Sequence, residues 1–372
     1  MKAQEAQNIA DLDFLYQSIQ KLPSYKDQLK GDNNYIKLYE KLRKDLNTDD
    51  DFEVYQKLLK LIYPIKDNHL GFYRKPDSTY KFNYLRSVLS LAELEAKYKA
   101  YPMDSLEGFY YNAKKTQRYV VVKQSQGRYY LQNLSSGLVE VILNQSQNGS
   151  MDAIFFRNPL VPYVLIRNVR FSSGNLIGLN FQKDANTNFS LLYPEASLYE
   201  YKNLDSTTGY LRLSSFSSTN QNIKVATDFF NRVKPDINAP KLIVDLRNNG
   251  GGGYKTSGQF IAFLKKYKGK IYLLQNGYTM SNAEQFIIDL QGANNLITLG
   301  ERTKGTITYG SNYDKTLSLP SNRFLFHPTD MSGRSKDLAY ESIGIKPDVT
   351  LDPVSEDWIT QTIKYIQITN HE

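Results

Sequence analysis

The chain has 372 residues, 41% hydrophobic and 23% charged, which is enough to bury a large core and to form two or three domains. It contains no cysteine, which excludes disulfides, zinc-thiolate sites and a cysteine nucleophile. The formal net charge is +8, but the basic residues are spread along the chain among acids and tyrosines. This pattern argues against nucleic-acid binding.

No apolar stretch approaches the roughly 20 residues that a membrane-spanning helix needs, so we expect no membrane span. The first residues, MKAQEAQNIADLDFLYQ, lack the charged and then apolar layout of a signal peptide. We expect an exported protein, periplasmic or extracellular, whose signal peptide precedes this numbering. A cytoplasmic location is the alternative.

The first part of the chain predicts helices. Apolar residues recur at helical spacing from Asp11 to about Tyr63, and NTDDDFEVYQKLLKLI has polar caps and acids before its apolar face. We interpret residues 1–78 as an N-terminal helical domain. It ends in the turn KDNHLGF, residues 66–72, which holds His69, one of three histidines. Of the others, His327 precedes a proline and is expected in a solvent-facing loop.

Residues 79–200 predict a β-rich module. QRYVVVKQSQGRYYLQNLSSGLVEVILNQ has the alternation of successive strands, with turns at residues 126–127 and 136–137. The segments GNLIGLNFQ and FSLLY continue this pattern. We expect a small antiparallel barrel or sandwich that positions substrate or binds a partner, with a spacer as the alternative.

Residues 201–372 alternate buried strands with helices of about ten residues. GYLRLSSF, KLIVDLRNN, IYLLQNG and NLITLGE read as strands, and the segments between them read as helices. This order predicts an α/β fold in which helices cover a parallel sheet. In such sheets, functional groups gather where strands end and helices begin. A capped helix, SEDWITQTIKYI, closes the chain with Trp358 packed inward.

The first junction at which we expect functional groups is DLRNNGGGGY. Here a buried strand runs into four glycines, Gly250 to Gly253. Without side chains, backbone N–H groups can point into a site, and beside a helix N-terminus they are suited to negative charge. We interpret the segment as an oxyanion hole or anion cradle rather than a flexible turn. Asp245 and Arg247 are expected to brace it by hydrogen bonds and opposite charge.

The second junction is NGYTMSNAEQF, in which Ser281 opens a helix. A serine at this position is usually only a cap. The glycine-rich turn one β-α unit earlier changes the interpretation, because both junctions fall at the same edge of the sheet. Ser281 would then face backbone donors, among them the N–H of Asn282, as an acyl-transfer nucleophile does. Glu284, one turn later, is expected only to favour the helix start.

Four segments in order, LIVDLRNNGGG, NGYTMSNAEQF, GERTKGT and YESIGIKPDV, resemble the core of the tail-specific, or C-terminal processing, family of serine peptidases. The resemblance implies a crotonase/ClpP-like core and an endopeptidase with no metal or cofactor. Ser281 would be its nucleophile, with an oxyanion hole from the glycine turn near Gly250 and Gly251 and from Asn282. The peptide-binding domain of many members has no counterpart here, because the β-rich module occupies its place.

The general base distinguishes two branches of this family. In the serine-lysine branch the catalytic lysine would stand at Thr306, and Lys304 lies two residues too early. The sequence more closely resembles the tricorn-core branch, which implies His69 as the base and Glu341 as its supporting acid. In that pattern a serine beside the histidine relays to the glutamate, and here Asn68 takes its place. Imidazole titrates near neutrality and suits this role.

Three functions compete. The first is a serine endopeptidase acting on polypeptides, and the second is an inactive relative that binds peptides or glycans through the β-rich module. The third is a crotonase-like acyl-transfer enzyme, because a glycine-built oxyanion hole also suits thioesters.

Overall fold

The computed structural model describes residues 2–369 except 82, 87–88, 101, 147–148, 157–160, 184–187, 192–196, 294 and 312–314. The chain divides into two compact units, Met1–Ala185 with Thr308–Ser335 and Asn186–Ile307 with Lys336–Glu372. Residues 308–335 therefore group with the first unit, although they lie inside the predicted C-terminal domain. The three-domain division at residues 78 and 200 stays a prediction.

The first unit begins with the predicted helices: α1 (Lys2–Gln20), α2 (Pro23–Gln28), α3 (Asn33–Asp45) and α4 (Asp51–Ile62). Aspartates start two of them. The Asp32 side chain accepts from the backbone N–H at the start of α3, and Asp50 does the same at α4. Apolar residues of α1 and α4 are fully buried in one core, so the residues at helical spacing in the sequence form the packed face of these helices.

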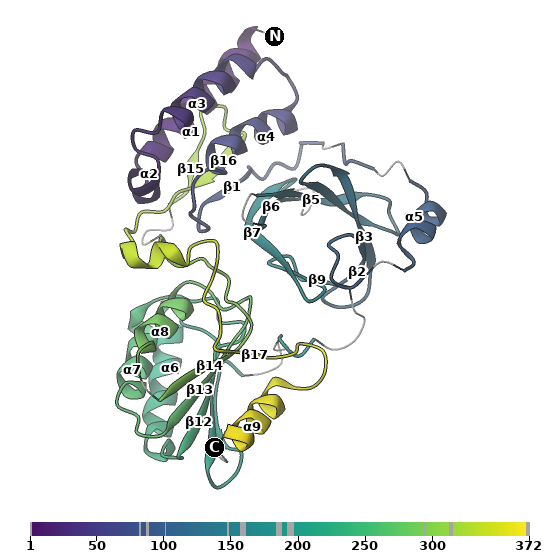
Figure 1. Ribbon diagram of the computed structural model, residues 1–372. Helices are drawn as coiled ribbons and strands as arrows, with labels where there is room; N and C mark the ends of the chain where they lie inside the picture. Colours follow the sequence, from purple (N-terminus) through teal and green to yellow (C-terminus); the bar gives the residue numbers. More distant parts are fainter. Residues whose placement is uncertain are drawn as a thin grey trace. The chain divides into compact units, whose positions relative to one another are not determined.

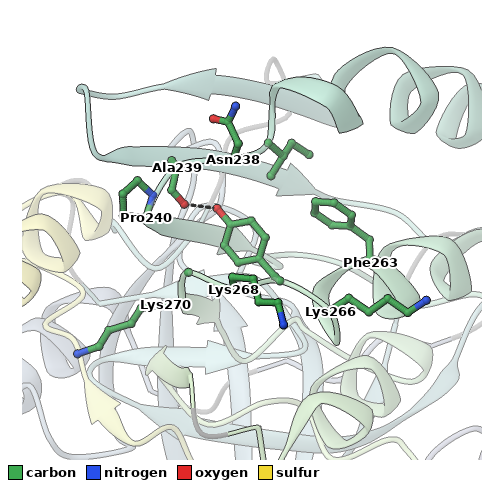
Figure 2. A pocket seen from close by; sticks show the side chains of 10 residues that line it. Asn238, Ala239, Pro240, Phe263, Lys266, Lys268 and Lys270 are labelled. Carbon is green, nitrogen blue, oxygen red and sulfur yellow. Dashed lines mark hydrogen bonds between the residues drawn. The ribbon is translucent and has the colours of Figure 1, made fainter.

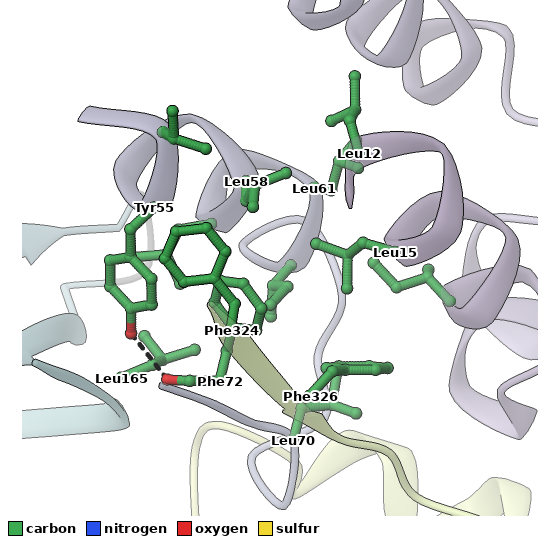
Figure 3. Packing of buried hydrophobic residues seen from close by; sticks show 14 of the residues in the cluster. Leu12, Leu15, Tyr55, Leu58, Leu61, Leu70, Phe72, Leu165, Phe324 and Phe326 are labelled. Carbon is green, nitrogen blue, oxygen red and sulfur yellow. Dashed lines mark hydrogen bonds between the residues drawn. The ribbon is translucent and has the colours of Figure 1, made fainter. Parts of the chain in front are cut away.

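This helical core also contains strands that are distant in sequence. Phe72 of β1 (Gly71–Arg74) and Phe324 of β16 (Phe324–His327) pack among the helix residues, as Figure 3 shows. The Tyr55 hydroxyl donates to the carbonyl oxygen of Phe72 at 2.7 Å. β1 pairs antiparallel with β16, and β16 pairs with β15 (Leu317–Ser318). The segment after His69 is therefore held by both packing and backbone pairing.

The β-rich part of this unit is a closed antiparallel barrel, which confirms one of the two predicted arrangements (Figure 1). Its strands follow the order β7-β6-β5-β4-β3-β2-β9-β8, and a β7–β8 pairing closes the ring. The barrel encloses its own apolar core. The elements are α5 (Leu91–Tyr98), β2 (Gly108–Asn112), β3 (Arg118–Ser125), β4 (Arg128–Asn133), β5 (Val139–Gln145), β6 (Met151–Phe155), β7 (Val164–Ser172), β8 (Asn175–Ile177) and β9 (Phe181–Gln182).

The second unit is built on a sheet in the order β10-β11-β12-β13-β14-β17. Only the β10–β11 pair is antiparallel, and the remaining pairs are parallel as predicted. The strands are β10 (Tyr199–Asn203), β11 (Thr208–Leu213), β12 (Lys241–Asp245), β13 (Lys270–Gln275), β14 (Leu296–Gly300) and β17 (Val349–Thr350). The helices are α6 (Asn220–Val233), α7 (Tyr254–Leu264), α8 (Asn282–Leu290) and α9 (Trp358–Thr369), with short 3-10 turns η1 (Lys234–Asp236) and η2 (Ser335–Ala339).

Both faces of this sheet are covered. Leu242 and Val244 of β12 pack with residues of α6, α7 and α8, whereas Ile243 packs on the other side with Trp358 of α9. Figure 1 shows the three helices and α9 on opposite sides of the strands. Burial on both faces explains why β12 is a continuous apolar run instead of an alternating one. Trp358 is fully buried, as expected.

Two local predictions are wrong. The segment FSLLY is not a strand at residues 189–191, and residues 192–193 lie outside the described part. The Asn188 side chain accepts from the N–H of Ser190 at 2.9 Å, which turns the chain there. His327 is not in a solvent-facing loop. It ends β16, pairs with Gly71 of β1 and is partly buried, because this pairing joins segments about 250 residues apart.

Among the described residues, no helix has both the length and the apolar character needed to cross a membrane.

Candidate active site

The two predicted junctions meet at one edge of the parallel sheet. The glycine-rich turn follows β12, and Ser281 follows β13 and immediately precedes α8. A Cβ built on Gly251 would lie 2.8 Å from the Cβ of Ser281 and 2.8 Å from the backbone nitrogen of Asn282. Only glycine allows so close an approach. The structure therefore brings Gly251, Ser281 and Asn282 together within the second unit.

Ser281 has an unusual backbone. Its φ is 56° and its ψ is −124°, a combination that non-glycine residues rarely adopt. The surroundings hold it there: the Ser281 N–H lies 2.9 Å from the carbonyl oxygen of Thr306 and 3.0 Å from Oε2 of Glu284, and it donates to both. Ser281 is partly exposed, so its hydroxyl belongs to a sharp, fixed turn at the start of a helix.

The glycine turn is itself fixed by hydrogen bonds. The Phe216 N–H donates to the Gly251 carbonyl oxygen at 3.0 Å, and the Gly253 N–H donates back to Phe216 at 2.8 Å. Gly251 has φ of 83° and donates its own N–H to Oδ1 of Asn249 at 2.9 Å. That N–H is thus engaged by the protein in this structure. The Asn282 N–H, at the first position of α8, is one of the donors that a helix start leaves without an intrahelical acceptor.

Glu284 makes more structural contacts than its expected role at the helix start requires. It is completely buried, and its Oε2 also accepts from the N–H of Thr306 at 3.0 Å. Its Oε1 accepts from the Thr303 hydroxyl at 2.5 Å and from the Gly305 N–H at 2.7 Å. Burial raises the pKa of Glu284, and these hydrogen bonds oppose the rise. One carboxylate thereby ties the Ser281 turn to residues 303–306.

Two buried polar atoms beside Ser281 have no hydrogen-bond partner in the described part of the chain. They are Oδ1 of Asn282 and the hydroxyl of Thr306. Thr306 occupies the position expected for lysine in the serine-lysine branch, and Lys304 is also buried. Buried polar atoms in native proteins are normally satisfied by protein, water or ligand. Both atoms are therefore candidates to contact a bound molecule or an ordered water.

Glu341, the predicted supporting acid, lies in the same unit as Ser281 and is buried. Its Oε2 accepts from the N–H of Ile307 at 2.9 Å. Ile307 directly follows Thr306, whose carbonyl oxygen accepts from Ser281. The same short segment therefore contacts both the predicted nucleophile and the predicted acid.

His69 and Asn68 belong to the first unit. The Asp67 carboxylate braces their turn, because it accepts from the His69 N–H at 3.2 Å and from the Thr329 hydroxyl at 2.6 Å. Burial lowers the pKa of His69 below its ordinary value; Asp67 opposes this shift, and nearby His327 adds to it. The imidazole is thus biased toward the neutral form that a general base requires. Its approach to Ser281 remains a prediction.

The expected brace at the end of β12 is present. Arg247 and Asp245 form a buried ion pair with 2.6 Å between Nη2 and Oδ2, and Nε contacts both carboxylate oxygens. The Tyr210 hydroxyl donates to the same carboxylate at 2.9 Å, and Arg247 donates to the Phe189 carbonyl oxygen at 2.9 Å. These contacts fix the segment from which the glycine turn begins.

Across the described residues, no group of three or more histidine, cysteine or carboxylate side chains is arranged to hold a metal ion.

The comparisons with known proteins address this same region. The model of Peptidase family S41 matches residues 207–265 and 254–351, which include the glycine turn, Ser281 and Glu341. This region matches peptidase family S41. The match covers less than half of the chain, and it supports a peptidase hydrolase of the kind that the sequence motifs indicated. It does not distinguish the serine-histidine branch from the serine-lysine branch.

Solved structures give low-identity likenesses. Mature CPAF has 13% identity and a TM-score of 0.50, with 100% of this chain and 99% of that chain covered. A putative peptidase from Parabacteroides merdae has 15% identity and a TM-score of 0.48, with 97% and 96% covered. The tricorn protease has 12% identity and a TM-score of 0.45, with 98% of this chain and 37% of that chain covered. No curated protein matches the chain. The likeness to mature CPAF concerns the fold alone.

Proposed function

We propose that this protein is a serine endopeptidase of family S41 that hydrolyses polypeptides through an acyl-enzyme on Ser281. The observation that carries the proposal is the backbone of Ser281, held at φ 56° against Gly251 at the start of α8. A strained turn of this kind presents a hydroxyl at the edge of a sheet, next to backbone N–H groups. The family match over the same residues supports the same reaction.

In the first step, the Ser281 oxygen forms a bond to the carbonyl carbon of the scissile peptide and gives up its proton to the general base. The oxyanion would accept from the Asn282 N–H and from a glycine N–H of the turn. Because the Gly251 N–H is engaged by Asn249, Gly250 is the better glycine donor in this arrangement. The carbon-nitrogen bond then breaks, the amine leaves with the proton, and water hydrolyses the ester.

His69 is our candidate for the general base, in a serine-histidine arrangement on a crotonase/ClpP-like core. Three features support it. Thr306 replaces the lysine of the other branch, and burial lowers the pKa of His69. The buried Glu341 accepts from the N–H of Ile307, the residue after Thr306, which contacts Ser281. A carboxylate that fixes the tautomer of the imidazole would complete the relay. Asn68 would pass the hydrogen bond from His69 to Glu341.

The test is covalent labelling with a fluorophosphonate probe, followed by mass spectrometry of the labelled peptide and by cleavage of a broad peptide library. We expect labelling at Ser281, and loss of labelling and cleavage in Ser281→Ala. The matched control is Ser218→Ala, an exposed serine near the glycine turn, which should keep both. A parent protein that neither labels nor cleaves would refute the proposal and favour a binding protein. Reaction with acyl thioesters alone would favour the crotonase-like alternative.

A further inference from the structure

The second unit contains a cavity of about 620 Å³ at a distance from the candidate active site along the strands. Residues 237–240, which precede β12, form one wall, and residues 266–270, which lead into β13, form another, together with Phe263 of α7 (Figure 2). The cavity therefore lies at the amino ends of β12 and β13. Ser281 and the glycine turn follow the carboxyl ends of the same strands, so the cavity is a separate site.

The walls of this cavity are held in place by the protein's own hydrogen bonds. The Tyr267 hydroxyl donates to the Ala239 carbonyl oxygen across it, and the Lys270 N–H donates to Pro240 at 2.9 Å. The Asn295 side chain donates to the carbonyl oxygens of Tyr267 and Gly269 at 3.0 and 2.8 Å. A cavity whose walls are cross-linked in this way is preformed, which reduces the entropy cost of binding.

The lining combines apolar surface with positive charge. Ile237, Phe263 and Tyr267 supply aliphatic and aromatic surface, and Phe263 and Tyr267 are only partly buried. The other polar side chains of the lining are Asn238 and three exposed lysines, and no acidic side chain is among them. A site with apolar and basic surface is complementary to a molecule that carries both apolar groups and negative charge.

The lysines are Lys266, Lys268 and Lys270, and none of them has an ion-pair partner in the part of the chain that the structure describes. The whole stretch from residue 246 to residue 283 contains no aspartate or glutamate. Residues 108–139 and 153–183 also lack aspartate and glutamate, so this stretch is one of several basic segments in a sequence of mixed charge.

We propose that this cavity binds an acidic segment of a polypeptide, with an apolar side chain in the cavity and carboxylates at the three lysines. Figure 2 shows the three lysine side chains along one side of the cavity, with their ammonium groups pointing apart. Lysine acts as a point charge, so three separated ammonium groups suit several carboxylates along an extended chain better than one compact anion. A polypeptide also supplies the apolar side chain for the space beside Phe263.

This site is independent of the proposed catalysis, because it lies at the other end of the strands and needs no proton transfer. Binding is therefore measured in Ser281→Ala, which cannot cleave the probe by the proposed route. The probe is a fluorescein-labelled peptide of alternating glutamate and phenylalanine. Its binding is measured by fluorescence anisotropy at two salt concentrations. Two control peptides replace either every glutamate by glutamine or every phenylalanine by serine.

We expect the acidic aromatic peptide to bind, both control peptides to bind at least about 10-fold more weakly, and added salt to weaken the interaction. The triple variant Lys266→Gln, Lys268→Gln, Lys270→Gln should also lose at least about 10-fold in affinity. The matched control, Lys37→Gln, Lys41→Gln, Lys44→Gln, removes the same charge from exposed positions of α3 and should bind like the parent.

Equal binding by the two triple variants would overturn the proposal, since the charge near the cavity would then be irrelevant. So would binding of the glutamine peptide as tightly as the acidic one. Vesicles of phosphatidylserine and of phosphatidylcholine complete the test. If the protein binds only the anionic vesicles and no peptide, and the cavity triple variant abolishes this binding, the site recognises a lipid surface and not a polypeptide.

Discussion

Oε2 of Glu284 accepts a hydrogen bond of 3.0 Å from the backbone N–H of Ser281. The same carboxylate holds residues 303–306 through three further donors, so a fully buried acid links the predicted nucleophile to the segment behind it. This arrangement explains how Ser281 maintains its positive φ. A strained backbone persists only where its surroundings over-determine it, and here they include the Glu284 carboxylate with its four hydrogen bonds and the Thr306 carbonyl oxygen, which also accepts from the Ser281 N–H.

Replacing this carboxylate should destabilise the protein and disorder the site. In Glu284→Gln, one oxygen becomes an amide that faces two donors, so we expect a loss of about 3 kcal/mol in the free energy of unfolding. The measurement is urea denaturation, with fluorophosphonate labelling of Ser281 as the second readout. Asp289→Asn on the same helix is the control, because Asp289 accepts from the Tyr254 hydroxyl at an exposed position. Comparable losses in both variants would contradict this role of Glu284.

Glu284 should also give stability a definite pH dependence. Burial raises its pKa above 4.5 in the folded state, so the folded protein holds this proton more tightly than the unfolded chain does. The stability that this tighter proton binding adds to the free energy of unfolding is fully present below about pH 4.5 and is lost as the pH rises through the raised pKa. Plots of the free energy of unfolding against pH should therefore differ in slope between the parent and Glu284→Gln across this range. Parallel curves would mean that Glu284 titrates alike in both states.

A methyl group at Gly251 should damage the site more than it damages the rest of the unit. The added Cβ would lie 2.7 Å from the Met280 carbonyl oxygen and 2.8 Å from the Asn282 nitrogen, at a φ of 83°. We expect Gly251→Ala to lose at least about 2 kcal/mol of stability and to lose labelling of Ser281. Gly258→Ala is the matched control, because a Cβ there meets no atom within 4 Å. Retained labelling in Gly251→Ala would argue against the close packing of these two turns.

The buried ion pair at the end of β12 offers a test of the scaffold. Asp245→Asn would leave the Arg247 guanidinium buried without its carboxylate, and we expect a loss of about 3–5 kcal/mol by thermal or chemical unfolding. The control is Asp228→Asn, which breaks an exposed pair with Lys224 and should change stability by less than about 1 kcal/mol. An Asp245→Asn variant as stable as this control would show that the brace is dispensable.

The sequence predicted most of this architecture because its main signals are local. Strands buried on both faces, such as β12, are continuous apolar runs, and two turns of the barrel carry their own glycine signals, at Gly127 and Gly137. The failures come from distant contacts. His327 pairs with Gly71 across some 250 residues, and the partners of Glu284 lie about 20 residues downstream. Glu284 stands three residues after Ser281, a capping spacing that marks a helix start and says nothing of residues 303–306.

The sequence suggested Ser281 and its oxyanion hole from the two β-α junctions, whereas the roles of His69 and Glu341 came only through family resemblance. Gly251 packs against Ser281 and Asn282 where the two β-α junctions meet. Three observations agree with the assignment of His69: an available imidazole, a missing lysine at position 306 and a buried acid at Glu341. This assignment therefore needs a test that responds to the charge of His69 itself.

The pH dependence of cleavage provides that test. A histidine base acts in its neutral form, so kcat/KM should rise with pH through the pKa of His69, and burial should place this limb below the usual value of about 6.5. Removing the negative charge in Asp67→Asn should move the limb to lower pH, because Asp67 raises this pKa. Removing the nearby imidazole in His327→Asn should move it to higher pH. Circular dichroism at each pH separates these shifts from unfolding, and a limb that moves in neither variant would exclude His69 as the base.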